Sequence, residues 1–254
     1  MMMLTATGLC ETLRVGMECN YAPYNWTQSE AGEAGVALKA GGYADGYDVR
    51  VAKIIADAMG RDLEIVKTEW DGLTPALLSG NIDVIIAGMS PTEKRRMTID
   101  FTDTYYTTEL CVVVRKDSPF AEAKSLSDLS GAKITGQMST FHYDMVDQIP
   151  GVVKMPAQDT FPTMIVAVSS GAIDGYVADR PGALSAVYAN PELTFVSFED
   201  GQGFDVPEDN REIAVGVPKG SPFKDEINEI LAGIDNEQRK ALMDASVQAQ
   251  PLSN

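Results

Sequence analysis

The sequence contains an internal repeat with an offset of 91 residues, from position 79 to position 170. The segment Ser79-Gly-Asn-Ile-Asp-Val-Ile-Ile-Ala-Gly88 returns as Ser170-Gly-Ala-Ile-Asp-Gly-Tyr-Val-Ala-Asp179. Each copy indicates a helix, then a glycine suited to a left-handed cap, then a strand that begins with Ile-Asp. A period this long is not that of a solenoid, and it predicts two lobes of similar topology. Chance is the alternative, because such short patterns also recur in unrelated α/β proteins.

The pairing at this offset extends backward from the two segments. It matches Trp70 with Phe161, Leu73 with Met164 and Leu77 with Val168. All of these positions are apolar, which is consistent with one helix face in each copy.

Helical and strand patterns alternate along the rest of the chain. Strands are predicted at 13–16 and 63–66, and helical spacing recurs near the C-terminus over 227–234. Between the two strands lies a predicted helix that ends at Gly60, with an apolar face formed by Val51, Ile54, Ile55 and Ala58. This alternation predicts an α/β fold with parallel sheets.

Composition narrows the range of functions. The 254 residues include 20 Lys and Arg against 37 Asp and Glu, a formal net charge of −17. Such an acidic chain is expected to repel phosphate backbones and anionic lipids, so we expect no binding to nucleic acid or to a membrane surface. No run approaches the ~18 apolar residues of a membrane span. The length corresponds to one large domain or two modest ones.

Three further features of the sequence are less informative. Met1-Met2-Met3-Leu4 has neither a basic region nor an apolar stretch, so the protein is cytosolic or its export signal has been removed. The odd number of cysteines, without a CxxC, predicts structural thiols at Cys10, Cys19 and Cys111. Residues 27–45 are rich in Gly and Ala without clear periodicity and predict a surface insertion.

The repeat also locates a candidate ligand site. In open α/β sheets, ligands bind beyond the carboxyl ends of the strands, which here are Gly88-Met-Ser90 and Asp179. Residues 91–95 predict a helix start, so backbone N–H groups and Arg95 would favour a carboxylate. Asp179 on the facing lobe would suit an ammonium. Together they match the two poles of an α-amino acid, although a solvated arginine and a helix-capping aspartate remain the simpler interpretation of each residue alone.

Seven segments in one order resemble the polar amino-acid family of substrate-binding proteins of ABC importers. The resemblance extends from about Leu13 to the C-terminal helices. The segments are Tyr21-Ala-Pro-Tyr24, Gly46-Tyr-Asp48, Trp70-Asp-Gly-Leu-Thr-Pro75, Gly80-Asn-Ile-Asp83, Met89-Ser-Pro-Thr-Glu-Lys-Arg95, Asp100-Phe-Thr-Asp103 followed by Tyr105-Tyr106, and Ile173-Asp174 leading to Asp179.

The resemblance implies two similar α/β lobes that are joined by a two-strand hinge and close on a ligand between them. Lobe one would comprise residues 1–106 and 212–254, and lobe two residues 107–211. The implied protein is a monomer without cofactor or metal. It would act at the periplasmic or extracellular face of the membrane, with lipid anchoring as one possible attachment, and would deliver its ligand to an ABC permease and its ATPase.

The resemblance also assigns site residues. Arg95 would bind the carboxylate with the help of the backbone around Gly88 and Met89 and of the Ser90 hydroxyl, and Asp179 would bind the ammonium. The remaining implied contacts are an aromatic wall of Trp70, Tyr21 and Tyr24, a second-lobe loop that includes Thr140 and Phe141, Gln137 at the strand end before that loop, and Glu18 at the side-chain end.

An acid at position 18 favours a cationic ligand such as arginine, lysine, histidine or ornithine. Glutamine or another neutral polar amino acid is the alternative, because a glutamine-binding member can also carry an acid there. Phe141 and Ala87 depart from the small polar and hydroxyl residues usual in the family. These departures and the 27–45 insertion bear on the identity of the ligand.

Two functions of other classes remain open. The sequence lacks GxSxG, HExxH and a Gly-rich phosphate loop, and its single histidine, His142, is predicted to be structural. An enzyme similar to the dehydratases of prephenate or arogenate, which share this fold, would need only a positioned acid such as Glu18 and a carboxylate clamp. A ligand-sensing receptor domain is the other alternative. We expect no enzymatic activity.

Overall fold

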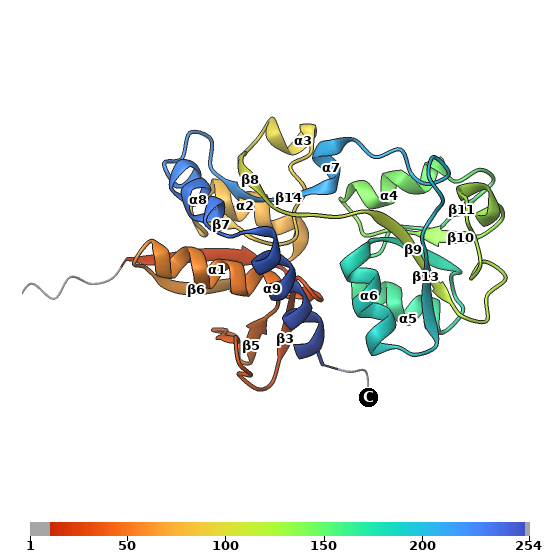
Figure 1. Cartoon of the computed structure of the whole chain (residues 1–254), viewed down its shortest axis with the longest axis horizontal. Coiled ribbons are helices and arrows are strands. Elements are labelled where there is room, and N and C mark those ends of the chain that lie inside the picture. The colour runs from red at the N-terminus through yellow and green to blue at the C-terminus, as the bar shows by residue number, and fades with distance from the viewer. Residues whose placement is uncertain (1–10, 252–254) are drawn as a thin grey trace, which may run out of the picture.

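The computed structural model describes residues 11–251 and has two α/β lobes side by side (Figure 1). Each lobe is built on a five-stranded sheet with helices packed on it. Within the described residues, none of the helices combines the length and the apolar character needed to cross a membrane. Met1-Met2-Met3-Leu4 and Cys10 lie outside the described residues.

The first sheet has the strand order β6-β1-β7-β14-β8. Strand β1 pairs in parallel with β6 and β7, whereas β14 is antiparallel to both β7 and β8. Helices α1, α2, α8 and α9 belong to this lobe. The bounds are β1 Thr12–Met17, β6 Asp62–Lys67, β7 Val84–Ile85, β8 Asp100–Thr107, β14 Glu212–Val217, α1 Tyr47–Ala58, η1 Trp70–Gly72, α2 Leu73–Leu78, α3 Glu93–Arg96, α8 Phe223–Ala232 and α9 Asn236–Ala249.

The second sheet has the order β11-β10-β12-β9-β13 and repeats the pairing of the first. Strand β10 is parallel to β11 and β12, and β9 is antiparallel to β12 and β13. The bounds are β9 Leu110–Arg115, η2 Leu126–Leu129, β10 Lys133–Thr135, α4 Phe141–Met145, η3 Val146–Gln148, β11 Val153–Lys154, α5 Phe161–Ser169, β12 Gly175–Asp179, α6 Arg180–Ala189, β13 Leu193–Val196 and α7 Glu208–Arg211.

The internal repeat corresponds to equivalent units in the two sheets. In the first copy α2 is followed by Gly80 (φ 72°) and β7, and in the second α5 is followed by Gly171 (φ 75°) and β12. Both strands occupy the middle position of their sheet, next to the antiparallel strand. The predicted pair of lobes with similar topology is therefore confirmed.

Two segments carry the chain between the lobes (Figure 1). Strand β8 of the first sheet is followed directly by β9 of the second, and the return runs from β13 through α7 to β14. The segments meet where the Thr108 N–H donates to the Arg211 carbonyl over 2.8 Å. The expected parallel pairing is present in both sheets, but each sheet is mixed, because the strands at these crossings run antiparallel to their neighbours.

Most predicted elements are present at the expected places. The strands at 13–16 and 63–66 lie in β1 and β6, and residues 227–232 of the predicted C-terminal helix lie in α8. Gly60 follows α1 with φ 64°, as a C-terminal cap requires. The helix expected over residues 91–95 begins only at Glu93, because Thr92 is its N-cap and accepts a hydrogen bond from the Arg95 N–H.

Residues 27–45 contribute strands that were not predicted. A small antiparallel sheet of order β2-β3-β5-β4 packs beside lobe one, with β2 Asn20–Tyr21, β3 Asn25–Gln28, β4 Val36–Ala37 and β5 Tyr43–Asp45. Trp26 is buried within it, and the Trp26 indole donates to the Gln28 side chain over 2.8 Å. These strands have only two to four residues, too few for a readable alternation.

Cys19 and Cys111 are buried free thiols within the main apolar core. Burial raises the pKa of Cys19 to about 12 and the pKa of Cys111 still further. Neither thiol is therefore reactive near neutral pH, in agreement with the predicted structural role.

Candidate ligand-binding cleft

The lobes meet around a small cavity of about 10 Å³. Lobe one lines it with residues from β2, η1, the segment after β7 and α3, and lobe two lines it with residues from the loop after β10, α4 and α5. Eight of the lining residues were predicted from the sequence: Tyr21, Trp70, Gly88, Ser90, Arg95, Gln137, Thr140 and Phe141. His142 and Phe161 complete the lining and were not predicted.

Arg95 supplies the positive charge at this cavity. Its Nη1 donates to the Ser90 carbonyl over 2.9 Å, and its guanidinium carbon lies 5.0 Å from the centre of the Trp70 ring. No acidic side chain among the described residues forms an ion pair with it. Loss of surrounding water lowers the pKa of Arg95 to about 10, so the guanidinium remains charged at neutral pH. Arg95 therefore faces the cleft as a cation that has no acidic partner within the described residues.

Ser90, Gly88 and Met89 contribute less directly than expected. The Ser90 hydroxyl donates to the Asn210 carbonyl over 3.0 Å, and the Gly88 N–H donates to the Tyr105 hydroxyl over 3.2 Å. Met89 is buried, and its carbonyl accepts from the Ala214 N–H. These hydrogen bonds stabilise the edge of the cleft, whereas Arg95 keeps donor atoms without a partner among the described residues.

A buried hydrogen-bond network holds Gly88 in place. The Tyr105 hydroxyl donates to Asp48 over 2.7 Å, and the Asn25 side chain donates to the other Asp48 oxygen over 2.7 Å. Burial raises the pKa of Asp48 to about 6. Gly88 itself has φ 61°, and an added Cβ would lie 3.2 Å from the Tyr21 ring. Glycine is therefore required at this turn.

Asp179 is the acid on the facing lobe. It ends β12 directly before α6, where an aspartate usually caps the helix, yet its side chain makes no capping bond. Instead Oδ2 accepts from the Tyr21 hydroxyl over 2.8 Å, and Oδ1 is buried without a hydrogen-bond partner among the described residues. The pKa of Tyr21 is raised well above its usual value, chiefly by burial and then by Asp179, so Tyr21 remains a donor.

Glu18 does not line the cavity itself, but it is bound to Gln137, which does. Both of its carboxylate oxygens accept from Gln137 Nε2, over 3.2 and 3.1 Å, and this nitrogen also donates to the Asp159 carbonyl. Burial raises the pKa of Glu18 to about 7, against the opposing effect of the Gln137 hydrogen bond. The pair joins lobe one to lobe two and places a titratable acid at the cleft.

Aromatic rings form the walls. Tyr21 stacks on Phe161 with ring centres 4.0 Å apart and touches Tyr24 on its other side at 4.9 Å. The Trp70 indole donates to the Ser139 carbonyl over 3.4 Å and so bridges the lobes. Tyr24 is fully buried behind Tyr21 and does not line the cavity. The sequence repeat could have indicated Phe161 as a site residue, since the 91-residue offset pairs it with Trp70.

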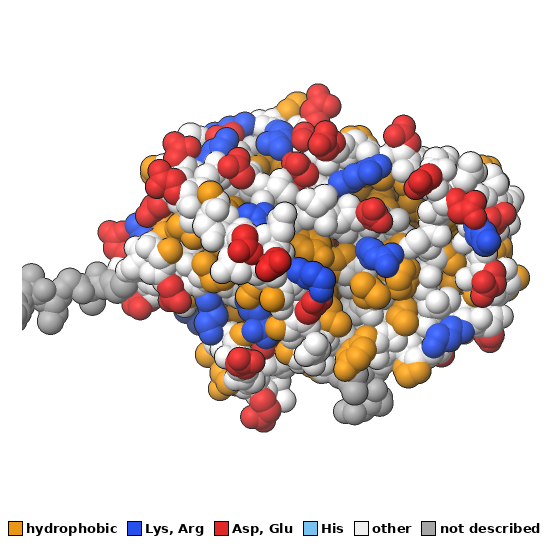
Figure 2. Space-filling view, in the orientation of Figure 1, with side chains coloured by type: hydrophobic (Ala, Val, Ile, Leu, Met, Phe, Trp, Pro, Cys, Tyr) orange, Lys and Arg blue, Asp and Glu red, His pale blue; other side chains and the backbone are white. Residues whose placement is uncertain are grey.

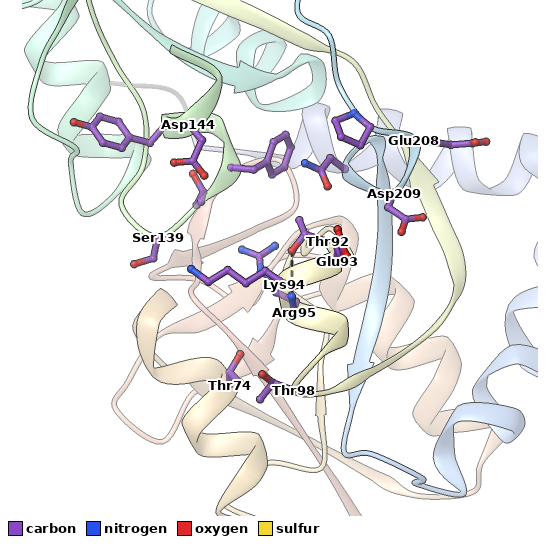
Figure 3. A pocket seen from close by; sticks show the side chains of 15 residues that line it. Thr74, Thr92, Glu93, Lys94, Arg95, Thr98, Ser139, Asp144, Glu208 and Asp209 are labelled. Carbon is purple, nitrogen blue, oxygen red and sulfur yellow. Dashed lines mark hydrogen bonds between the residues drawn. The ribbon is translucent and has the colours of Figure 1, made fainter. Parts of the chain in front are cut away.

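A larger cavity of about 800 Å³ adjoins the small cavity on its outer side, where α3 of lobe one faces α4 of lobe two (Figure 3). Arg95, Thr140 and Phe141 line both cavities. Figure 3 shows Lys94 and Arg95 on α3, with Ser139 and Asp144 approaching from lobe two. The outer cavity is thus the mouth of the cleft.

Charged side chains of both signs line the mouth of the cleft, among them Lys94, Arg95, Glu208 and Asp209. Figure 2 shows acidic side chains spread over both lobes and apolar side chains exposed along the middle of the face, where the lobes meet. Within residues 11–251, His, Cys, Asp and Glu side chains form no group of three that could hold a metal ion.

Comparisons with known proteins agree with this architecture. A family of bacterial extracellular solute-binding proteins, family 3, matches residues 13–245. A probable histidine-binding protein of Campylobacter jejuni is 33% identical over 197 residues, which cover 76% of this chain and 70% of that protein.

Two solved structures of reconstructed ancestral proteins have the same two-lobed fold. An ancestral arginine-binding protein bound to glutamine is 29% identical with a TM-score of 0.76, covering 93% of this chain and 98% of its own. An ancestral amino-acid-binding protein, a precursor of cyclohexadienyl dehydratase, is 28% identical with a TM-score of 0.75, covering 93% and 95%. The expected two-lobed α/β fold is confirmed. The match over 13–245 shows that the chain belongs to family 3 of the bacterial extracellular solute-binding proteins.

Proposed function

We propose that this protein binds a polar α-amino acid with a cationic side chain between its lobes and delivers it to the permease of an ABC importer. In this proposal Arg95 binds the α-carboxylate, Asp179 binds the α-ammonium and Glu18 faces the cationic end of the ligand. Trp70, Tyr21 and Phe161 enclose the aliphatic part of the ligand.

One observation carries the proposal. Arg95 and Asp179 come from opposite lobes to the place where the lobes meet, and each has side-chain atoms without a hydrogen-bond partner among the described residues. Arg95 has no acidic partner among the described residues, and Asp179 Oδ1 is buried without a hydrogen bond. Asp179 is buried and Arg95 is partly buried, and a charge removed from water is costly unless it is paired. A zwitterion that spans the cleft satisfies both groups at once.

Glu18 and the relatives support a cationic ligand. An arginine, lysine, histidine or ornithine side chain near Glu18 would favour the ionised acid, whose pKa is otherwise raised to about 7 by burial. The C. jejuni relative is a probable histidine-binding protein, and one ancestral structure is an arginine-binding protein. That structure holds glutamine, so a neutral polar amino acid is the alternative ligand.

The mechanism that we propose is closure of the lobes on the ligand. A cavity of about 10 Å³ holds one water molecule at most, so an amino acid can reach it only when the lobes separate. Lobe one would comprise residues 1–106 and 212–254, and lobe two residues 107–211. The composition of the two sheets supports this division. The ligand binds the closed state better because it contacts both lobes, and it therefore shifts the population toward closure.

The partners follow from the family. We propose a monomer that acts outside the cytoplasm and docks on an ABC permease and its ATPase, with lipid anchoring as one mode of attachment. The protein would bind its ligand without chemical change. A dehydratase function is the alternative, for which Glu18 would serve as the acid.

A thermal-shift panel on refolded, ligand-free protein tests the proposal. The panel contains the twenty amino acids, ornithine, citrulline, polyamines and prephenate. At a concentration 100 times the dissociation constant, a ligand adds ~2.7 kcal/mol and raises the melting temperature by about 5–10 °C. A shift with arginine, lysine, histidine or ornithine supports the proposal. A shift with neutral amino acids alone contradicts the role of Glu18, and turnover of prephenate contradicts a purely binding function.

A further inference from the structure

Two buried side chains beside the cavity have polar atoms without hydrogen-bond partners among the described residues. They are both ring nitrogens of His142 and Oδ1 of Asp179. The side chains are 7% and 1% exposed, and His142 Nε2 lies 3.4 Å from Asp179 Oδ1. This distance permits charge attraction, but the groups are not aligned as a hydrogen bond. Buried polar atoms without partners are rare, and two such side chains in contact, of which His142 lines the cavity, point to a ligand.

The local structure fixes the imidazole in place. Thr140 begins the α4 turn, and the Thr140 hydroxyl donates to the Gln137 carbonyl over 2.7 Å. The His142 ring stacks on Phe141 at 4.4 Å and meets Phe161 edge-on at 6.4 Å. His142 therefore lines the cavity at a defined position rather than filling the core of lobe two.

Few charged or titratable groups face His142. From β12, Asp179 is in direct contact, and from β2 the Tyr21 hydroxyl binds the other oxygen of that carboxylate. From α3, Arg95 lines the same cavity, whereas the nearest part of α5 is the uncharged Phe161 ring. On α4 itself, Tyr143 and Asp144 line the outer cavity instead, and Glu18 is one step removed, bound to Gln137.

Building on the proposed function, we propose that His142 is a ligand-binding residue whose neutral imidazole accepts a hydrogen bond from the α-ammonium of the amino acid at Nε2. Asp179 Oδ1 accepts a second hydrogen bond from the same ammonium. In the ligand-free protein the imidazolium can occupy this place against Asp179. Binding then releases the Nε2 proton to solvent, the remaining ring proton stays on Nδ1, and the ligand keeps its ammonium charge.

The physical reason is that two cations cannot share one buried carboxylate at low cost. An imidazolium beside the ammonium would be a like-charge contact with little water to screen it. A neutral imidazole instead offers an acceptor to a group that has three donors. Histidine is the side chain that proteins commonly use in both its neutral and its protonated form.

Calorimetric titration in two buffers with different ionisation enthalpies measures the released protons directly. The ligand is the amino acid that gives the largest thermal shift, and the titrations are made at pH 5.0, 6.0 and 7.5. A cationic ligand can also release a proton from Glu18, so the titrations are made in both the wild type and Glu18→Gln. In Glu18→Gln we expect up to one proton released per ligand at acid pH and a Kd that rises about tenfold per pH unit below the imidazole midpoint.

Two variants separate ligand binding from a structural role of His142. In the Glu18→Gln background, His142→Gln keeps an acceptor that does not titrate, so we expect it to bind with no proton release and a flat pH profile. His142→Phe keeps the ring without an acceptor and should bind at least tenfold more weakly than His142→Gln at pH 7.5. If His142→Gln does not fold, the proton release and the pH profile of Glu18→Gln alone test whether His142 binds the ligand.

The possible failures are distinguishable. If Glu18→Gln binds an amino acid without proton release and with a flat profile between pH 5.0 and 7.5, the inference about His142 is overturned and the proposed function stands. The inference about His142 is also overturned if the double variant Glu18→Gln/His142→Gln releases as many protons on ligand binding as Glu18→Gln does. If wild-type protein binds no amino acid at any pH, the proposed function itself is overturned.

Discussion

At the scale of single residues, the cleft is held closed by polar contacts that run from one lobe to the other. Glu18 is bound by Gln137, Tyr21 by Asp179, and the Trp70 indole by the Ser139 carbonyl. Arg95 differs, since its only side-chain hydrogen bond within residues 11–251 goes to a carbonyl of its own lobe. Replacement of Arg95 should therefore affect ligand binding more than closure.

Arg95→Ala should abolish or nearly abolish binding of every α-amino acid. A ligand carboxylate that enters the closed cleft without its partner costs ~2–5 kcal/mol, or about 30-fold to several thousand-fold in Kd. Calorimetric titration measures the loss. Arg96→Ala is the matched control, because it removes the same charge from the same helix, and its affinity should stay within about threefold of wild type. Equal affinities of Arg95→Ala and wild type would refute the clamp.

Glu18 should make the ligand-free protein less stable as the pH rises. Its pKa is raised in the folded protein to about 7, so the folded state holds a proton that the unfolded chain releases near pH 4.5. The associated stability is fully present below about pH 4.5 and is lost as the pH rises through 7, by at most about 3 kcal/mol. Urea unfolding at pH 4.5, 6 and 7.5 measures this loss.

Glu18→Gln should reduce the slope of the free energy of unfolding against pH. The pH dependence that remains would come from other buried acids such as Asp48. Glu69→Gln is the control, because Glu69 is an exposed acid whose charge adds only a smaller part of the Glu18 shift, so its replacement should reduce the pH dependence much less than Glu18→Gln does. An unchanged slope in Glu18→Gln would show that this carboxyl is not the titrating group.

At the scale of elements, the repeat predicts the parts of the site that come from regular structure. A helix, a glycine and a strand at a fixed offset place Gly88 and Asp179 at equivalent strand ends, and pair Trp70 with Phe161. The small sheet around Trp26 was not predicted, because strands of two to four residues do not develop a period. His142 was not predicted as a cavity residue either, since its position depends on the packing of Phe141 and Phe161, which no local pattern encodes.

The glycine between α2 and β7 allows a direct test at this scale. Gly80 has φ 72°, and an added Cβ would meet no atom within 4 Å, so only backbone strain opposes a side chain. Gly80→Ala should lower the free energy of unfolding by about 1 kcal/mol in urea, and Gly80→Asn by less, because asparagine tolerates this conformation better. Equal or higher stability of Gly80→Ala would contradict the role as a cap.

At the scale of the whole molecule, the C-terminal helix also spans the lobes. Helix α9 packs on α1, and beyond its end the Gln250 amide exchanges hydrogen bonds with Ser185 on α6. Both side chains are buried. The lobes are therefore held together beyond the end of α9 as well as at the ligand cavity. When the lobes separate, the hydrogen bonds between Gln250 and Ser185 must either break or move with one lobe.

Spin labels on the two lobes should detect the opening. Met97 and Val153 are exposed and lie on different lobes, and buried Cys19 and Cys111 are poor targets for the label. With Cys10 replaced by serine, the Met97→Cys/Val153→Cys pair should show a broad distance distribution without ligand and one narrow peak with it. Labels at Leu78 and Met97, both on lobe one, should not respond. A single unchanged distance between the lobes would contradict closure by the ligand.

The measurement that tests the central claim most directly is calorimetric titration of ligand-free protein with L-arginine and with agmatine, its analogue without the carboxylate. Both carry the same guanidinium toward Glu18, so they differ in the group assigned to Arg95. We expect L-arginine to bind at least 100-fold more tightly than agmatine, with the difference lost in Arg95→Ala. Equal binding of the two, or no binding of any cationic amino acid, would contradict the account.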